Sequence, residues 1–255
     1  MNKSGTPQDY GSSMPQSVTI ARLGIEVTPA TVSQVTDWVF SPRKSPQLLL
    51  NHNLHSAYLY RTSASMRRAY QESALTIVDG APIRWMASIT ARRRFSSATR
   101  VGSTDWIAAL PPNRPARLFL YGASAASNSR AVENLREQLP SWSIEGIDGY
   151  RVSEEAVAAI QVFQPDLVLV GLGMPRQETF LLTNLHSLPV AVYATVGGAI
   201  DYIAGANKLA PRWIGRLGLE WLWRLCHEPR RLSSRYLIEP LRLLAHVALK
   251  RNPGS

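Results

Sequence analysis

Short apolar runs alternate with helix-like segments along most of this chain, and this alternation restricts the possible folds more than any other feature. Apolar runs lie at 47–51, 75–78, 118–121 and 167–170. Such runs are typical of buried strands, and the segments between them, with apolar residues at steps of three and four, are typical of amphipathic helices. Alternating strands and helices form mostly parallel sheets with helices on both faces. We therefore expect an α/β fold with a Rossmann-like sheet.

The remaining expected elements follow from the same periodicities. The segment Val18–Val27 alternates like a hairpin, and Pro82 stands where a helix can begin without needing its N–H. Further strands are expected at 143–147 and 190–195, and helices at 31–40, 54–72, 126–139, 153–163 and 175–186.

Composition divides the chain into three parts. Residues 1–16 are polar, contain Gly, Ser and Pro, and lack an apolar stretch, so we expect a disordered leader and no signal peptide. Residues 17–207 contain the α/β alternation. Residues 208–255 hold ten Lys or Arg against three Glu, which places +7 of the net charge of +10 there. We expect this last part to be a basic helical appendage.

Bulk composition sets further limits. A hydrophobic content of 45% with 18% charged residues supports a sizeable core. The net charge of +10 indicates an anionic partner such as nucleic acid, a phosphate-rich substrate or an acidic membrane. A single cysteine excludes an internal disulfide and favours a reducing compartment. The uncharged run 179–200 contains Pro189 and two glycines, so we expect a helix followed by a strand and no transmembrane helix.

A glycine-rich segment directly follows one of the apolar runs. Gly171-Leu-Gly-Met-Pro-Arg-Gln-Glu178 continues from the run at 165–170 into a new helix. In open α/β sheets, ligands bind where strands end and helices begin. The sequence therefore predicts a ligand-binding edge here.

Polar side chains also end the early strands. Asp79 follows an apolar strand and precedes Gly80, where partial desolvation would suit a general base. It also suits an Asp that caps the helix begun by Pro82, and spacing alone favours this cap. Asn51 and Asn53 at the same edge fit either a polyhydroxylated ligand or the shaping of a turn.

The segment Arg100–Asp105 offers a cation before a helix start, which fits either an anionic group or a solvated arginine.

The chain lacks the sequence motifs of several cofactor-binding and metal-binding sites. The chain contains neither Gly-x-Gly-x-x-Gly nor Gly-x-x-x-x-Gly-Lys-Ser/Thr, so a nicotinamide cofactor and a nucleoside triphosphatase are poorly supported. His52 and His55 have no accompanying Cys cluster, and the seven aspartates never form Asp-x-Asp, the usual magnesium–diphosphate clamp. We expect no metal site and no cofactor.

The C-terminal part has an amphipathic pattern. Trp213, Leu217, Trp221 and Leu225 stand at steps of four beside a stripe of arginines. This pattern fits a helix in a membrane interface, with rings at headgroup depth and arginines on phosphates. It also fits a helical hairpin docked on the sheet with solvated arginines.

Taken together, these motifs resemble the WecG/TagA/CpsF family of bacterial glycosyltransferases across residues 18–240. The most specific stretches are Gly171–Glu178, Gly197–Asp201, Ala210–Trp213, Gly218–Trp221 and Glu228–Arg231, and the first half matches through Asn53, Asp79-Gly80, Arg100 and Asp105. The family usually has Thr in place of Asn51 and Gly in place of Pro82.

The resemblance implies an inverting, metal-independent transfer from a UDP-sugar of N-acetylmannosamine, N-acetylmannosaminuronic acid or glucose type. The implied acceptor is a polyprenyl-diphosphate-linked saccharide used in surface polysaccharide synthesis. The implied location is the cytoplasmic face of the membrane, as a peripheral protein that binds no nucleic acid.

The resemblance also assigns roles to residues of this chain. Asp79 is the implied general base. The implied donor and sugar contacts are Asn51, Asn53, Gln177 and Asp201. The implied contacts to diphosphate or lipid phosphate are Arg100, Arg224, Arg231 and Arg235, and those to the membrane are Trp213, Trp221 and Trp223.

Two other interpretations remain open. The charge also fits a non-catalytic α/β module that binds RNA or another polyanion, although no RNA-binding motif is recognisable. The apolar residues of the appendage also allow a homo-oligomer.

Overall fold

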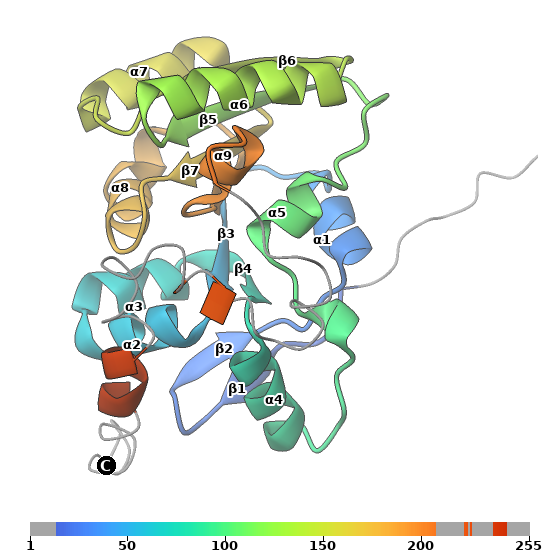
Figure 1. Ribbon diagram of the computed structural model, residues 1–255, viewed down its shortest axis with the longest axis vertical. Helices are drawn as coiled ribbons and strands as arrows, with labels where there is room; N and C mark the ends of the chain where they lie inside the picture. The colour runs from blue at the N-terminus through green and yellow to red at the C-terminus, as the bar shows by residue number, and fades with distance from the viewer. Residues whose placement is uncertain (1–13, 208–221, 224, 226–236, 244–255) are drawn as a thin grey trace, which may run out of the picture.

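The computed structural model describes residues 14–207, 222, 223, 225 and 237–243. Within these residues, six strands form one parallel sheet in the order β4-β3-β8-β7-β5-β6 (Figure 1). Its strands are β3 (Gln47–His52), β4 (Ser73–Val78), β5 (Ala116–Gly122), β6 (Trp142–Ile147), β7 (Leu167–Gly171) and β8 (Val192–Thr195). The α/β fold expected from the alternation is confirmed.

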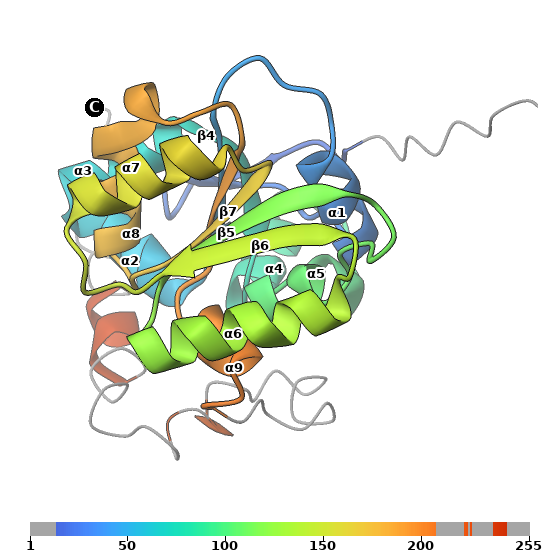
Figure 2. The same ribbon diagram turned by 90° about the horizontal axis from the view of Figure 1, so that it is seen from above.

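Helices cover both faces of the sheet, as Figure 2 shows from above. One face packs against α1 (Val32–Val39), α5 (Ser103–Ile107), α6 (Ala125–Gln138) and α9 (Ala199–Ile203). The other packs against α3 (Ala64–Gln71), α7 (Ser153–Phe163) and α8 (Arg176–Asn184). The 3₁₀ turns η1 (Ser97–Thr99) and η2 (Leu185–Ser187) complete the connections.

The central strands are buried on both faces, which explains their uninterrupted apolar sequences. In β3, Leu49 packs into the core on the α6 side, while Leu48 and Leu50 pack into the core on the α7 side. Successive side chains of a strand point to opposite faces, so a strand between two helical layers needs apolar residues at every position.

The predicted hairpin is present and extends the structure beyond the β4 edge. Strands β1 (Val18–Ile20) and β2 (Ile25–Val27) pair antiparallel. Thr28 then forms a parallel bridge with Ile77. The hairpin packs with α2 (Leu54–Thr62) and α4 (Ala81–Thr90) around a third apolar cluster.

The helix expected over 54–72 is divided into two. Ser63 has extended backbone angles (φ −122°, ψ 127°), ends α2, and accepts a hydrogen bond from the Met66 backbone N–H at the start of α3. A serine oxygen satisfies one of the unpaired N–H groups of a helix start, so Ser63 supports a new helix rather than continuing the old one. Helical spacing on both sides concealed this break.

The ends of the chain are partly described. Residues 1–13 of the expected leader lie outside the described residues, whereas Met14 packs against the core. Of the expected appendage, 222, 223, 225 and 237–243 are described, and these are helical. No helix in the described ranges combines the length and apolar composition needed to cross a bilayer.

Candidate active site

The carboxyl ends of β4, β3 and β8 bring together three of the predicted site residues. Asn51 lies in β3, Asn53 follows that strand, and Asp79 follows β4. The Asp79 backbone N–H donates to the His52 carbonyl oxygen at 2.9 Å, which continues the pairing of β3 with β4 beyond its last ladder residue. Asn53 and Asp79 are 26 residues apart in the chain, and their side chains meet because β3 and β4 are parallel neighbours.

Asn53 has two roles, because it caps α2 and contacts Asp79. The Asn53 Oδ1 accepts a hydrogen bond from the Ser56 backbone N–H at 3.0 Å. Since a backbone N–H can only donate, this contact makes the other amide atom a nitrogen. That nitrogen, Nδ2, donates to the Asp79 Oδ2 at 3.3 Å. The helix start therefore fixes the orientation of a donor that holds the Asp79 carboxylate.

Ser56 hydrogen-bonds with the backbone of Asn53, and His52 contacts Ser56 in turn. The buried Ser56 hydroxyl donates to the Asn53 carbonyl oxygen and accepts from the Asn53 N–H. Its single hydrogen is thus used, so the contact of 3.0 Å with His52 Nδ1 requires that nitrogen to donate. Burial lowers the pKa of His52 to about 3, so the ring is neutral at physiological pH.

His52 is further immobilised by Tyr70. The two rings stack with centroids 3.9 Å apart, and the Tyr70 hydroxyl donates to the Asn51 carbonyl oxygen at 2.6 Å. His52 is therefore a structural residue, as expected for a histidine without accompanying ligands.

Asp79 is not the cap of α4. The N-cap residue of α4 is Gly80, at φ 111°, and no side chain makes a capping hydrogen bond there. The alternative that Asp79 caps the helix begun by Pro82 is therefore wrong. Only glycine adopts this φ readily, and the sharp turn at Gly80 leaves Asp79 on the sheet side of the helix start.

Asn51 presents an acceptor that is not used within the described residues. Its Nδ2 donates to the Ser103 hydroxyl and to the Thr195 carbonyl oxygen, both at 3.3 Å. Its buried Oδ1 accepts no hydrogen bond from the described part of the chain. An unpaired buried acceptor costs about 1–3 kcal/mol, and a ligand N–H or O–H would remove that cost.

The loop that carries Arg100 is attached to the same edge. The Val101 backbone N–H donates to the Val78 carbonyl oxygen at 2.9 Å, one residue before Asp79. Gly102 follows, and a Cβ placed there would lie 3.9 Å from the Asp79 Oδ1. Arg100, the predicted cation, thus lies two residues before Gly102, which is close to the carboxylate of Asp79, the predicted base.

Gln177 is fully buried and connects α8 to the loop after β8. Its Oε1 accepts from the Gly197 backbone N–H at 3.1 Å, and its Nε2 donates to Glu178 Oε1 at 2.8 Å. Asp201 lies in the first turn of α9, directly after this loop. Both predicted donor contacts thus lie around the Gly197 turn at the carboxyl end of β8.

A second part of the edge lies between β5 and β7. The chain leaves β5 through α6 on one face and leaves β7 through α8 on the other, which makes this a topological switch point. A Cβ on Gly122 would stand 2.5 Å from the Gly171 backbone, so only glycine permits the strands to end this closely.

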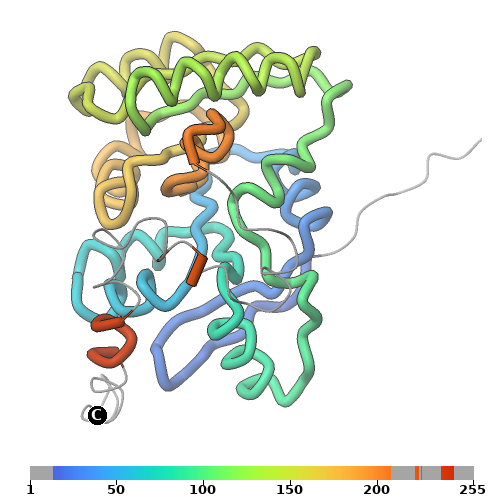
Figure 3. Tube along the Cα trace, in the orientation of Figure 1, coloured from blue at the N-terminus to red at the C-terminus, as the bar shows by residue number. Residues whose placement is uncertain are grey.

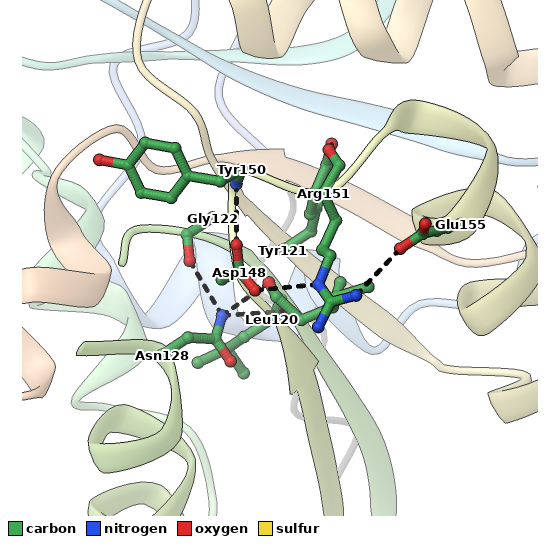
Figure 4. Close-up of polar contacts among 9 residues, drawn as sticks. Leu120, Tyr121, Gly122, Asn128, Asp148, Tyr150, Arg151 and Glu155 are labelled. Atoms are coloured by element: carbon green, nitrogen blue, oxygen red, sulfur yellow. Dashed lines mark hydrogen bonds and ion pairs between the residues drawn. The ribbon is translucent and has the colours of Figure 1, made fainter. Parts of the chain in front are cut away.

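The loop after β5 is held by Asn128 of α6, as Figure 4 shows. Its Nδ2 donates to the carbonyl oxygens of Gly122 and Ile147 at 3.0 and 2.9 Å. In the neighbouring loop, Asp148 accepts from the Tyr150 N–H and lies 3.4 Å from the Arg151 guanidinium. These contacts fix the backbone around the Gly122 turn.

The described C-terminal segment returns to this region. Glu239 contacts His55 in the first turn of α2. Leu243 is buried in the third apolar cluster, with residues of the hairpin, α2 and α4. Figure 3 shows 237–243 beside α2. Residues 237–243 therefore pack against the α/β body. Their contact residue His55 is two positions after Asn53 in the chain.

Most of the other predicted appendage residues lie outside the described part of the chain, namely Arg224, Arg231, Arg235, Trp213 and Trp221. Trp223 is described and is half-buried. Among the described residues, no group of three His, Cys, Asp or Glu side chains is placed to hold a metal ion.

Sequence reasoning missed three residues of the site: Ser56, Ser103 and Thr195. Ser56 carried a signal, since Asn53-x-x-Ser56 matches the spacing of a capping box. Ser103 and Thr195 carried none, because their contacts with Asn51 join distant segments.

Comparisons with known proteins identify the family of this chain. A model described as "Glycosyl transferase WecG/TagA/CpsF family" matches residues 20–254. A Bacillus subtilis (strain 168) protein named N-acetylglucosaminyldiphosphoundecaprenol N-acetyl-beta-D-mannosaminyltransferase is 33% identical over 62% of this chain and 63% of its own length. Proteins of the same name from Bacillus spizizenii and Staphylococcus aureus (strain MRSA252) are 38% and 32% identical, over 45% and 46% of this chain.

The chain matches less than two thirds of the length of each of these relatives, namely 63%, 46% and 47%. The family model, in contrast, spans nearly the whole chain. The chain therefore belongs to the WecG/TagA/CpsF family of glycosyl transferases.

Proposed function

We propose that this protein transfers a sugar from a UDP-sugar to a polyprenyl-diphosphate-linked saccharide, with inversion at the anomeric carbon. The observation that carries the proposal is the Asp79 carboxylate, held by Asn53 at the carboxyl end of a parallel sheet. Membership of a glycosyl transferase family supplies the reaction class.

In this reaction Asp79 acts as the general base. An acceptor hydroxyl attacks the anomeric carbon of the donor, and its proton passes to the Asp79 carboxylate. The bond between the anomeric carbon and the diphosphate oxygen breaks, and UDP leaves with the electron pair. Asn53 holds Asp79 Oδ2 through its amide, which keeps the carboxylate oriented toward the acceptor during the attack.

Positive side chains stabilise the departing diphosphate without a metal ion. Arg100 stands on the loop attached to the end of β4. The appendage supplies Arg224, Arg231 and Arg235. Guanidinium groups bind phosphate oxygens through paired hydrogen bonds, so they offer the charge that a magnesium ion provides in other sugar transferases. Activity in excess EDTA is the corresponding expectation.

The donor occupies the edge between the Gly197 turn and Asp79. Asn51 Oδ1 supplies an acceptor there that no described residue uses, and it fits a sugar hydroxyl or the N–H of an acetamido group. The names of the relatives favour N-acetylmannosamine as the transferred sugar and an N-acetylglucosaminyl-diphospholipid as the acceptor.

The lipid of such an acceptor remains in the bilayer, which supports a peripheral position at the membrane, and we propose the cytoplasmic surface. The docking of 237–243 beside α2 supports an appendage that reaches both membrane and active site.

The test is an Asp79→Asn variant with a radiolabelled UDP-sugar and a synthetic lipid-diphosphate acceptor. We expect transfer to fall by about 10²–10⁴-fold, the usual contribution of a general base, while calorimetric donor binding stays near that of the unchanged protein. Glu137→Gln, the same chemical change on the exposed surface of α6, serves as the matched control. Near-normal turnover by Asp79→Asn would refute the assignment.

A further inference from the structure

Helix α4 exposes two large apolar side chains on one side. Trp85 and Ile89 are 54% and 78% exposed and stand four residues apart, while Ile83 and Ala87 are buried on the opposite side. Residues four apart in a helix lie on the same face. The exposed face of α4 is therefore apolar where a solvated helix would carry polar side chains.

The segment that contains α4 is strongly basic. Residues 80–104 hold five arginines and no Asp or Glu, a charge of +5. Residues 208–255 carry +7 of the total of +10, so the residues outside these two segments together carry −2. Three of the five, Arg92 to Arg94, follow α4 directly and are exposed. A second basic region thus exists outside the appendage.

The apolar face of α4 starts close to the site, and the arginines follow its far end. Helix α4 begins at Ala81, two residues after Asp79, and its ten residues span about 15 Å. Leu243 of the C-terminal segment packs into the same cluster as Ile83 and Ala87. Figure 1 shows α4 and the red segment 237–243 at the same end of the molecule.

We propose that α4, through Trp85 and Ile89, and the Arg92–Arg94 turn form a docking surface for an anionic bilayer. Tryptophan rings favour the level of the lipid headgroups, aliphatic side chains beside them enter the acyl boundary, and arginines pair with lipid phosphates. With this face in the interface, Asp79 stands beside the membrane surface. Lipid binding by this surface does not depend on the proposed transfer reaction.

A second copy of this chain fits the same surface less well. In a two-fold symmetric contact through α4, both copies contribute the same patch, so both bring their Arg92–Arg94 turn and its positive charge into one interface. Like charges brought together in this way oppose association. An anionic bilayer supplies the complementary charge.

The test is sedimentation of the full-length protein with vesicles of phosphatidylcholine alone or mixed with an equal amount of phosphatidylglycerol. Each arginine near an anionic surface contributes about a fivefold increase in partitioning, so the triple Arg→Gln variant at 92–94 should bind mixed vesicles about a hundredfold more weakly. Trp85→Ser combined with Ile89→Ser should weaken binding at least about tenfold.

Matched controls lie away from this face. Val162→Ser removes an apolar residue that is 86% exposed on α7, and Arg130→Gln removes an exposed arginine on α6; both should bind vesicles like the unchanged protein. Equal binding by the α4 variants and the controls would overturn the proposal. It would also be overturned if Trp85→Ser/Ile89→Ser only lowered the mass in analytical ultracentrifugation, because a second copy would then be the occupant.

Discussion

Replacing Asn53 by Asp separates the two roles of this residue. Aspartate is as good an N-cap as asparagine, so its oxygen can still accept from the Ser56 N–H and α2 should start normally. The other oxygen, however, replaces the amide donor that lies 3.3 Å from Asp79 Oδ2. Two negative charges at this separation repel by about 1 kcal/mol in bulk water and by about 5 kcal/mol at an effective dielectric constant of about 20.

This repulsion disfavours the ionised form of the carboxylate pair and raises its pKa. Because Asp79 must be ionised to accept a proton, the acid limb of the pH–rate profile should move upward. At about 1.4 kcal/mol per pH unit, the repulsion corresponds to about one to three and a half pH units. The assay is kcat/KM for sugar transfer as a function of pH, with the free energy of unfolding measured in parallel.

Asn53→Ser provides the matched control. Serine also caps helices well, but its short side chain neither reaches Asp79 nor carries a charge. Its turnover should fall, and the acid limb should move upward much less than in Asn53→Asp, because only a hydrogen bond to the carboxylate is lost. An Asn53→Asp profile that coincides with that of the unchanged protein would refute the contact between residues 53 and 79 as an element of catalysis.

Two further predictions concern stability. Gly122→Ala should destabilise the fold by about 3 kcal/mol in urea denaturation, because its Cβ would stand 2.5 Å from the Gly171 backbone at a φ of 144°. Gly24→Ala, with φ 68° and open space around it, should cost only about 1 kcal/mol, and equal losses would contradict this reasoning. Burial lowers the pKa of His52 to about 3, so the unfolded chain binds one more proton between that pH and pH 6.5. Stability should therefore fall as pH drops through this range, by up to about 1.4 kcal/mol per pH unit, and His52→Gln should remove that slope.

The alternation of strands and helices was accessible from the sequence because periodicity is a local property. The apolar run of β3 indicates a strand buried on both faces whichever strands flank it. The break at Ser63 was not accessible in this way. Helical spacing continues through 54–72, and only the extended backbone of that serine ends one helix and starts the next.

The ligand edge was also predictable in part. Asp79 and Asn53 each follow an apolar run, and parallel strands end at a common edge, so their proximity follows from the fold class. The choice between base and cap for Asp79 was not predictable. It depends on Gly80 at φ 111°, which takes the N-cap position of α4.

The sequence by itself therefore determined the kind of fold, the edge proposed to bind the ligand and the residue types present there, because these depend on spacing within one segment. The tertiary structure alone decided which partners those residues meet. Asn51 reaches Ser103 and Thr195 across 52 and 144 residues, and the face of α4 is exposed because no described element covers it. Contacts of this kind depend on strand order and on packing between distant segments, and no local pattern in the chain encodes either.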